Sequence, residues 1–326
     1  MATLQELVAT TWEKREKKPS DLVKNNNPYL LMLNEKGNVK TIPGGSFIRE
    51  PVRIDRNRYL QRIDARQEIE LGSNPVMNYF DFAPKIYVIP VVMDYLEKAQ
   101  NQGDAQFLDL LDERLEIADE SLENGVEEDL QGDGTSYGGK GFTGIQAYFP
   151  TSTGSGSVGG LSRVSYPQIR NVSIQADTYF GSATDGSNIE SRLRVVKNQV
   201  ILNGKGPDVL LAGEDFYNYG ADSMSAKFRF TRNEKLYDQG FDNYMIENMT
   251  ALLAKGKVWD GSARIPSKRA YGINLNTIRL KMYRGFNFEP VKERVAVNQL
   301  MDAALTVGIG NQTTNNPGVN FVFWEP

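Results

Sequence analysis

The sequence predicts an α+β fold, because its strand-like and helix-like segments follow one another without a regular repeat. Residues alternate between apolar and polar in two stretches between Thr41 and Leu71, and a further strand is expected from Val76 to Val92. One long amphipathic helix is expected from Asp104 to Leu130, and short apolar strands follow Asn203. Strands and helices do not alternate along the whole chain, so a doubly wound parallel sheet is not expected.

The composition excludes several kinds of active site. The 326 residues are 40% apolar and 24% charged, and they include no cysteine and no histidine. A disulfide, a thiolate nucleophile, a serine–histidine pair and an ordinary zinc site are therefore ruled out. We expect no enzyme, cofactor or metal site. We also expect no membrane span, since no stretch approaches ~18 apolar residues, and no secretory leader, since the start is charged.

Residues 1–43 are expected to form an extended N-terminal arm. A short amphipathic start is followed by the charged run Glu13–Lys18 and the polar run Asn25–Asn27. Such a segment buries little apolar surface by itself, so we expect it to be ordered only where something else holds it.

Residues 44–80 are expected to form a long two-stranded ribbon. After the turn at Pro43-Gly44-Gly45, one face carries Ile48, Val52 and Ile54, and a second alternating stretch carries Ile63, Ala65, Ile69 and Leu71. An isolated ribbon is not stable in water, so we expect it to lie either on its own domain or, through its unpaired edge, on another molecule. The candidate intersubunit contacts are the ribbon's arginines: Arg49, Arg53, Arg56, Arg58, Arg62 and Arg66.

The long helix is strongly acidic on all but one face. Its apolar residues recur every three or four positions, at Phe107, Leu111, Leu115, Ala118, Leu122 and Val126. From Asp104 to Asp133 there are twelve carboxylates and one arginine, although the net charge of the whole chain is only −4. These carboxylates either form a solvated face or meet a positively charged part of another subunit. The candidate acidic face consists of Asp109, Asp112, Glu113, Glu116, Asp119, Glu120 and Glu123.

The remainder is expected to combine loops, short helices and strands. Residues 132–160 are rich in glycine and serine and are expected to form loops and short strands. Helices are expected at Asn188–Leu202 and from about Gly213 to Met224. Strands are expected at Pro207–Ala212, Tyr244–Ile246, Thr277–Tyr283, Val295–Val307 and Val319–Trp324.

Two patterns resemble catalytic motifs but lack required residues. Gly134–Lys140 matches the first part of a phosphate-binding loop, yet Gly141 stands where a hydroxyl must hold magnesium. Paired carboxylates for glycoside hydrolysis can be drawn from any acidic sequence, and nothing singles out one pair. A monomeric carboxylate-based hydrolase stays open as an alternative.

The order of these features resembles that of the major capsid proteins of tailed bacteriophages, which have the Hong Kong 97-type fold. The resemblance rests on Asn27–Leu31 followed by Gly37–Gly45, and on Phe82–Val92 leading into the acidic helix. It continues through Pro207–Leu211, Asn287–Pro290 and the closing segment from Val297 to Phe323. It therefore covers the chain from about Asn27 to the C-terminus.

This resemblance implies a division of the chain. It implies an N-terminal arm (1–43), an extended loop or E-loop (44–80), a peripheral domain (81–175) with a spine helix (104–131), an axial domain (176–289) and a return to the peripheral domain (290–326). The E-loop would lie over a neighbouring subunit, and the acidic face of the spine helix would line the interior.

The resemblance also implies function and partners. Copies would self-assemble into hexamers and pentamers of an icosahedral head that holds double-stranded DNA without sequence specificity. The virion capsid would assemble in the host cytoplasm with separate scaffolding and portal proteins. No lysine lies between Lys40 and Lys85, so the lysine-dependent cross-link of some family members has no donor, and a cement protein is a further candidate partner. An encapsulin-type cellular compartment is the main alternative.

Overall fold

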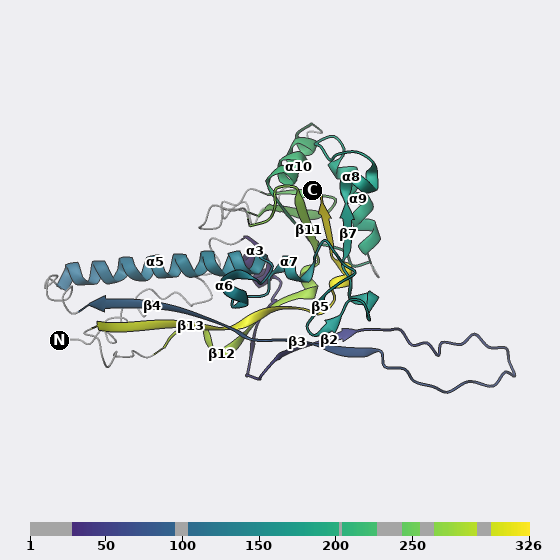
Figure 1. The fold of residues 1–326 in the computed structure, drawn as a ribbon, viewed down its shortest axis with the longest axis horizontal. Helices are drawn as coiled ribbons and strands as arrows, with labels where there is room; N and C mark the ends of the chain where they lie inside the picture. Colours follow the sequence, from purple (N-terminus) through teal and green to yellow (C-terminus); the bar gives the residue numbers. More distant parts are fainter. Residues whose placement is uncertain (1–27, 95–103, 202–203, 227–242, 255–263, 292–300) are drawn as a thin grey trace.

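The computed structural model describes residues 28–94, 104–201, 204–226, 243–254, 264–291 and 301–326. These residues form two main sheets, a separate two-stranded ribbon, a short hairpin and the helices around them (Figure 1). The hairpin consists of β5 (Ser157–Val158) and β6 (Leu161–Ser162). The predicted α+β class is confirmed.

A long four-stranded sheet lies beside the acidic helix. Its strand order is β1-β12-β13-β4, with β1 parallel to β12 and the other pairs antiparallel. The bounds are β1 (Val39–Ile42), β4 (Lys85–Asp94), β12 (Ile278–Val291) and β13 (Met301–Thr314). Helix α5 (Asp104–Gln131) runs along this sheet and contacts β4 (Figure 1).

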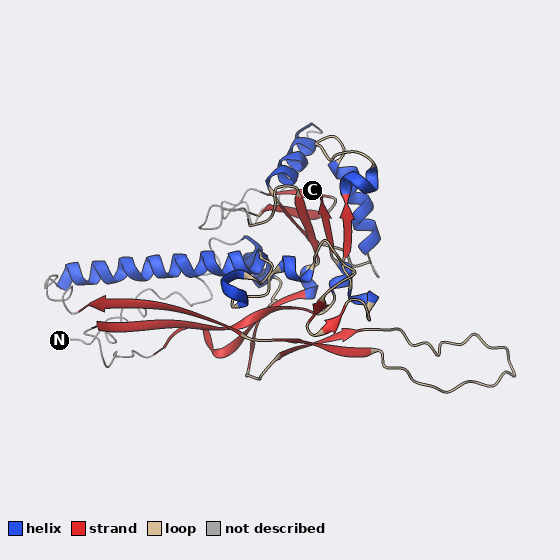
Figure 2. Ribbon diagram, viewed as in Figure 1, coloured by secondary structure: helices blue, strands red, loops and turns tan. Residues whose placement is uncertain are grey.

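A six-stranded sheet forms the other main layer, with helices α8 (Ala176–Phe180), α9 (Ile189–Val200) and α10 (Glu214–Ala226) packed against it (Figure 2). Its strand order is β7-β14-β11-β8-β10-β9. The bounds are β7 (Val172–Gln175), β8 (Val209–Ala212), β9 (Asn243–Ile246), β10 (Met249–Leu253), β11 (Arg269–Ile273) and β14 (Phe321–Trp324).

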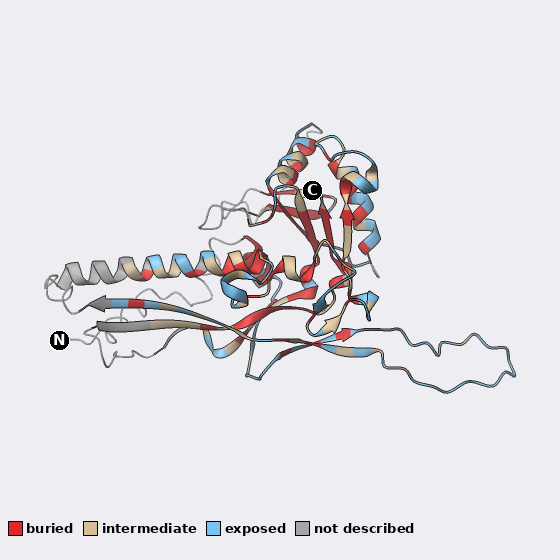
Figure 3. Cartoon of the chain, in the orientation of Figure 1, coloured by how far each residue is buried: buried red, intermediate tan, exposed pale blue. Residues whose placement is uncertain are grey.

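The six-stranded sheet is buried on both faces. Leu210 and Ala212 belong to the apolar cluster under α9 and α10, whereas Val209 and Leu211 belong to a second cluster that also contains β12 residues. The second cluster therefore joins the two sheets. Figure 3 shows the buried residues concentrated around this junction.

Residues 28–42 do not form an extended arm, so this part of the prediction is wrong. They form helix α3 (Pro28–Glu35) and strand β1, while residues 1–27 lie outside the described residues. Tyr29 and Leu33 are fully buried in the cluster that joins the sheets. The apolar run Tyr29–Leu33 is long enough for one short helix to be buried. The prediction of an arm missed it, because that prediction rested on the charged and polar residues that precede the run.

The predicted ribbon is shorter than expected. Strands β2 (Ile48–Arg53) and β3 (Met77–Phe82) pair with each other. Ile48, Val52 and Ile54 share one face as predicted, and that face is buried within this chain. The second alternating stretch is not a strand: residues 54–76 form an irregular projection, which we call the projecting loop (Figure 1). Alternation predicts a strand only where a partner strand is available, and none pairs with these residues.

Helix α5 has nearly the predicted bounds, and four positions of the predicted stripe are described, of which Ala118 is half-buried. Leu115, Leu122 and Val126 are buried, while the side chains of Phe107 and Leu111 lie outside the described residues. The predicted strand from Val76 to Val92 is divided into β3 and β4 at Ala83–Pro84. Proline lacks the N–H that a continuous ladder requires, which explains the break.

Most later predictions are confirmed, with three differences. Ile145–Tyr148 forms a short helix, α7, rather than a strand, and α6 (Ser136–Gly139) precedes it. The sequence did not indicate β7, β10 or β11. The predicted division at residue 290 also does not coincide with a change of sheet, since β12 and β13 share one sheet and β14 belongs to the other.

Candidate interaction surfaces

The projecting loop exposes large apolar side chains. Leu60 is 77% exposed and Leu71 is 95% exposed, and Tyr59, Ile63 and Ile69 are exposed as well. A single chain in water gains nothing from holding so many apolar groups on an extended loop. The loop therefore has the character of a contact surface.

Side-chain amides join the two sides of the loop in place of a strand ladder. Gln61 Nε2 donates to the Glu70 carbonyl over 2.8 Å, and the Glu70 N–H donates to Gln61 Oε1 over 3.1 Å. Nearer the ribbon, Asn74 Nδ2 donates to the Arg56 carbonyl over 3.0 Å. These bonds keep the two sides adjacent while leaving the outer surface open.

Asp55 organises the basic residues at the start of the loop. Its carboxylate accepts a hydrogen bond from the Arg56 N–H, and Arg58 Nε donates to it over 2.7 Å. The bond from the Arg56 N–H lowers the pKa of Asp55, and the Arg58 guanidinium lowers it further. Asp55 therefore stays ionised and holds Arg58 in place.

The six predicted arginines divide into two groups. Arg49 Nε lies 2.9 Å from Asp81 Oδ1 across the ribbon, Arg53 Nε donates to the Asp55 carbonyl over 3.1 Å, and Arg58 binds Asp55. The guanidinium groups of Arg56, Arg62 and Arg66 are exposed and have no hydrogen bond or ion pair with the described part of the chain. The second group is thus available to a partner, although the intersubunit role of all six stays a prediction.

The predicted acidic face of α5 is described at two of its seven positions. Asp119 is half-buried and Glu120 is exposed. The side chains of the other five lie outside the described residues: Asp109, Asp112, Glu113, Glu116 and Glu123. The orientation of this face toward an interior stays a prediction.

At the C-terminal end of α5, two carboxylates are buried instead of solvated. Glu127 and Asp129 are 4% and 2% exposed. Arg264 Nη1 lies 2.9 Å from Glu127 Oε2, and Asp129 accepts hydrogen bonds from the hydroxyls of Tyr87 and Ser136. Burial raises the pKa of Tyr87, and the hydrogen bond to Asp129 raises it further, so the hydroxyl stays protonated and donates. Arg264 and Tyr87 are distant in sequence from these carboxylates, which is why acidity alone suggested solvent exposure.

A second apolar surface lies on the face of the long sheet that points away from α5. Ile86 and Val88 of β4 are 62% and 50% exposed, and Val92 is also exposed. Ile309 and Val307 pair with Ile86 and Val88, so their half-buried side chains share this face. We call it the outer face; its apolar exposure was not foreseen from the sequence pattern.

Neither a metal centre nor a membrane helix is found among the described residues. These residues contain no group of three or more acidic side chains arranged to hold a metal ion. None of their helices combines the length and apolarity needed to cross a bilayer. Gly134–Lys140 follows helix α5 rather than joining a strand to a helix, so the phosphate-loop geometry is also missing.

Comparison with known proteins shows the fold. No protein-family model and no curated protein matches the sequence. The capsid asymmetric unit of cyanophage A-1(L) matches with a TM-score of 0.64 at 12% identity, over 90% of this chain and 92% of that chain. The capsid of Myoviridae phage XM1 matches with a TM-score of 0.53 at 9% identity, over 90% of this chain and 91% of that chain.

A cellular shell protein is also similar. The holo-SrpI encapsulin complex from Synechococcus elongatus PCC 7942 matches with a TM-score of 0.53 at 9% identity, over 90% of this chain and 86% of that chain. Such identities establish architecture without fixing function. The chain therefore has the α+β fold of these capsid and encapsulin proteins, as its resemblance to Hong Kong 97-type capsid proteins predicted.

Proposed function

We propose that this chain is the major capsid protein of a tailed bacteriophage and that its copies form the hexamers and pentamers of an icosahedral head. The observation that carries this proposal is the projecting loop, whose apolar side chains stay exposed in a single chain. The likeness of the fold to phage capsid structures supports it. A structural role also agrees with a sequence that lacks the usual catalytic and metal-binding side chains.

The proposed contact places the projecting loop of one subunit on its neighbour. The loop's apolar residues require an apolar partner surface, and the outer face around Ile86 and Val88 provides one on a second copy. Arg56, Arg62 and Arg66 would pair with carboxylates of that neighbour. Each exposed pair contributes only about 0.2 to 1 kcal/mol, but a shell repeats the contact many times.

The two main sheets support a peripheral and an axial domain. The long sheet with α5 would form the peripheral domain, the six-stranded sheet would form the axial domain, and residues 44–80 would form the E-loop. Sheet membership favours placing β12 in the peripheral domain and β14 in the axial domain.

We further propose that the acidic face of α5 lines the interior of a head that encloses double-stranded DNA. Carboxylates repel the phosphate backbone, so such a lining would keep packaged DNA from adhering. The virion capsid would assemble in the host cytoplasm with a scaffolding protein, a portal and a cement protein as partners.

Particle formation by the purified chain tests the main proposal. We expect hexamers, pentamers or closed shells, each much larger than the 36.5 kDa single chain. Size-exclusion chromatography and negative-stain electron microscopy over a series of protein concentrations provide the measurement. A species that stays monomeric at every concentration contradicts the proposal and favours the monomeric hydrolase.

An encapsulin-type compartment is the second candidate, because an encapsulin complex has the same fold. The contents of particles purified from the natural source distinguish the two. Nuclease-resistant, genome-length double-stranded DNA supports a phage head, whereas an enclosed protein cargo without such DNA supports a cellular compartment.

A further inference from the structure

Three side chains of β12 hold the base of the ribbon. Arg279, Lys281 and Tyr283 occupy alternate positions, so they share the face opposite the buried residues Leu280 and Met282. Arg279 Nη1 lies 3.0 Å from Glu50 Oε2, and Lys281 Nζ lies 2.7 Å from Glu50 Oε1.

Two further bonds from this face reach the backbone of the ribbon and of the connection that precedes it. Lys281 Nζ donates to the Arg49 carbonyl over 3.2 Å, and the Tyr283 hydroxyl donates to the Gly45 carbonyl. One strand face therefore contacts the ribbon at three successive outward positions, with Glu50 bound by two of them.

Glu50 is an unusual residue for the inner face of a ribbon. It is 1% exposed and lies on the same face of β2 as the buried Ile48 and Val52. Thr313 Oγ1 donates to Glu50 Oε1 over 2.9 Å, so two cations and one hydroxyl surround the carboxylate. A carboxylate buried this deeply is tolerated only when it is paired in good geometry.

The ribbon's backbone alone does not fix its direction. β2 and β3 pair only with each other, and the ribbon joins the long sheet through Pro43–Phe47 and Ala83–Pro84. Gly44 and Gly45 have φ values of 136° and 142°, which favour glycine, and a side chain added at Gly44 would meet nothing within 4 Å. Of the contacts described above, only the bond between the Tyr283 hydroxyl and the Gly45 carbonyl holds this connection, and one hydrogen bond at a glycine does not fix the angle of the strand that follows.

Other contacts attach the ribbon without setting the direction of β2. Ile48 and Phe80 pack in the cluster that joins the sheets, but apolar burial is non-directional. The Asp81 N–H donates to the Gly159 carbonyl over 3.0 Å, which holds only the β3 side. Charge-assisted hydrogen bonds are directional, so the Glu50 cluster is the contact that can orient β2.

We infer that Glu50, held by Arg279 and Lys281, fixes the direction of the ribbon and projecting loop within a single chain, before any neighbour is bound. Glu50 is thus a positioning residue. Under the proposed shell function, on which this consequence rests, a loop already aimed at its neighbour loses less conformational freedom when the contact forms.

The absence of cysteine allows a direct test on the unassembled chain. Leu71→Cys on the loop and Val195→Cys on α9 place two spin labels at exposed positions, 95% and 40% exposed. Electron–electron double resonance should show one narrow distance peak between the labels. Glu50→Gln keeps the side-chain shape but removes the charge, and we expect the narrow peak to be lost.

Arg49→Gln is the matched control, because Arg49 pairs with Asp81 across the ribbon and its side chain makes no ion pair with β12. We expect that variant to keep the narrow peak. Should Glu50→Gln fail to fold, the triple variant Glu50→Gln, Arg279→Gln, Lys281→Gln leaves no buried charge unpaired and should also lose the peak. A narrow peak in a folded Glu50 variant, single or triple, overturns the inference.

The labels report on single chains, so this result does not depend on shell formation. A chain that never assembles but loses the peak on Glu50→Gln would refute the proposed function and retain this inference. A chain that assembles normally and keeps the narrow peak in the Glu50→Gln variant would refute this inference and leave the proposed function in place.

Discussion

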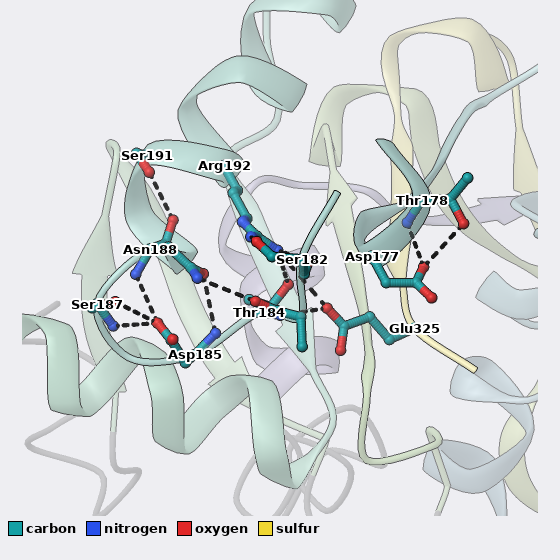
Figure 4. Close-up of polar contacts among 11 residues, drawn as sticks. Asp177, Thr178, Ser182, Thr184, Asp185, Ser187, Asn188, Ser191, Arg192 and Glu325 are labelled. Carbon is teal, nitrogen blue, oxygen red and sulfur yellow. Dashed lines mark hydrogen bonds and ion pairs between the residues drawn. The ribbon is translucent and has the colours of Figure 1, made fainter. Parts of the chain in front are cut away.

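Single buried charges connect distant parts of this chain, as Arg192 on α9 shows (Figure 4). It is 5% exposed, and its Nη1 donates to the Ser182 carbonyl and to Thr184 Oγ1, both over 2.9 Å. Glu325, just after β14, accepts a hydrogen bond from the Thr184 N–H over 2.6 Å and lies 4.0 Å from Arg192 Nη1. Arg192 therefore ties the turn before α9 to the end of the six-stranded sheet.

Arg192→Met should destabilise the unassembled chain by about 3 to 5 kcal/mol, because it leaves the carboxylate of Glu325 buried without its cation. Arg194→Met is the matched control two residues along the same helix. Arg194 is 55% exposed and pairs with Glu190 and Glu247, so its loss should cost far less. Unfolding by urea, followed by circular dichroism, measures the free energy of unfolding of both variants. Equal decreases in the two variants would contradict this account.

Sequence patterns could not reveal these buried charges. Glu50 alternates correctly with Ile48 and Val52 on the inner face, but its partner Arg279 lies 229 positions away. Glu127 likewise finds Arg264 far along the chain. Charged residues are seldom buried unless they are paired. When only the local spacing is known and the partner is distant in sequence, such a residue is therefore predicted to be exposed to solvent.

Among whole elements, the best predicted are those whose own residue pattern indicates which side is buried. The stripe of α5 and the fully apolar strand β8 each carry their own signal, and both are present. Helix α3 was missed because its apolar residues are adjacent and its stability comes from packing between two sheets. The projecting loop shows the opposite error, since its alternation at Ile63, Ile69 and Leu71 has no partner strand.

The acidic face of α5 yields a prediction for this element. We expect shells to form normally when its seven carboxylates become Asn or Gln, but duplex DNA to bind their interior more tightly at low salt. The reason is that fewer negative charges oppose the phosphates, and the difference should shrink as salt screens them. The changed residues are Asp109, Asp112, Glu113, Glu116, Asp119, Glu120 and Glu123.

Binding of labelled duplex DNA to opened shells across a salt series measures this effect. The substitutions preserve side-chain shape, so an unchanged unfolding midpoint serves as the control for folding. Equal DNA affinity of the variant and the parent at low salt would show that the face does not act as a lining.

In the whole molecule, the two exposed apolar surfaces belong to different parts of the chain. The projecting loop extends from one end, and β4 and β13 extend toward the other (Figure 1). A contact between the loop of one copy and the outer face of the next is therefore head-to-tail. Such heterologous contacts close into rings when the rotation between copies permits, which is the geometry that hexamers and pentamers require.

Charge reversal in the loop tests this arrangement at the scale of the assembly. Changing Arg56, Arg62 and Arg66 to Glu should prevent shell formation while single chains keep their fold, because these side chains have no ion pair with the described part of their own chain. Each lost pair removes about 0.2 to 1 kcal/mol, and the new charges add repulsion at every copy of the contact. Circular dichroism and negative-stain electron microscopy report folding and assembly separately.

The same three positions changed to Lys provide the control, since lysine keeps the charge and we expect shells to persist. High salt should weaken assembly of the parent and narrow its difference from the Glu variant, because exposed pairs are screened. If the Glu variant forms normal particles, the arginines play no part in joining subunits. The apolar side chains of the loop, with Leu60 and Leu71 the most exposed, would then have to hold the contact alone.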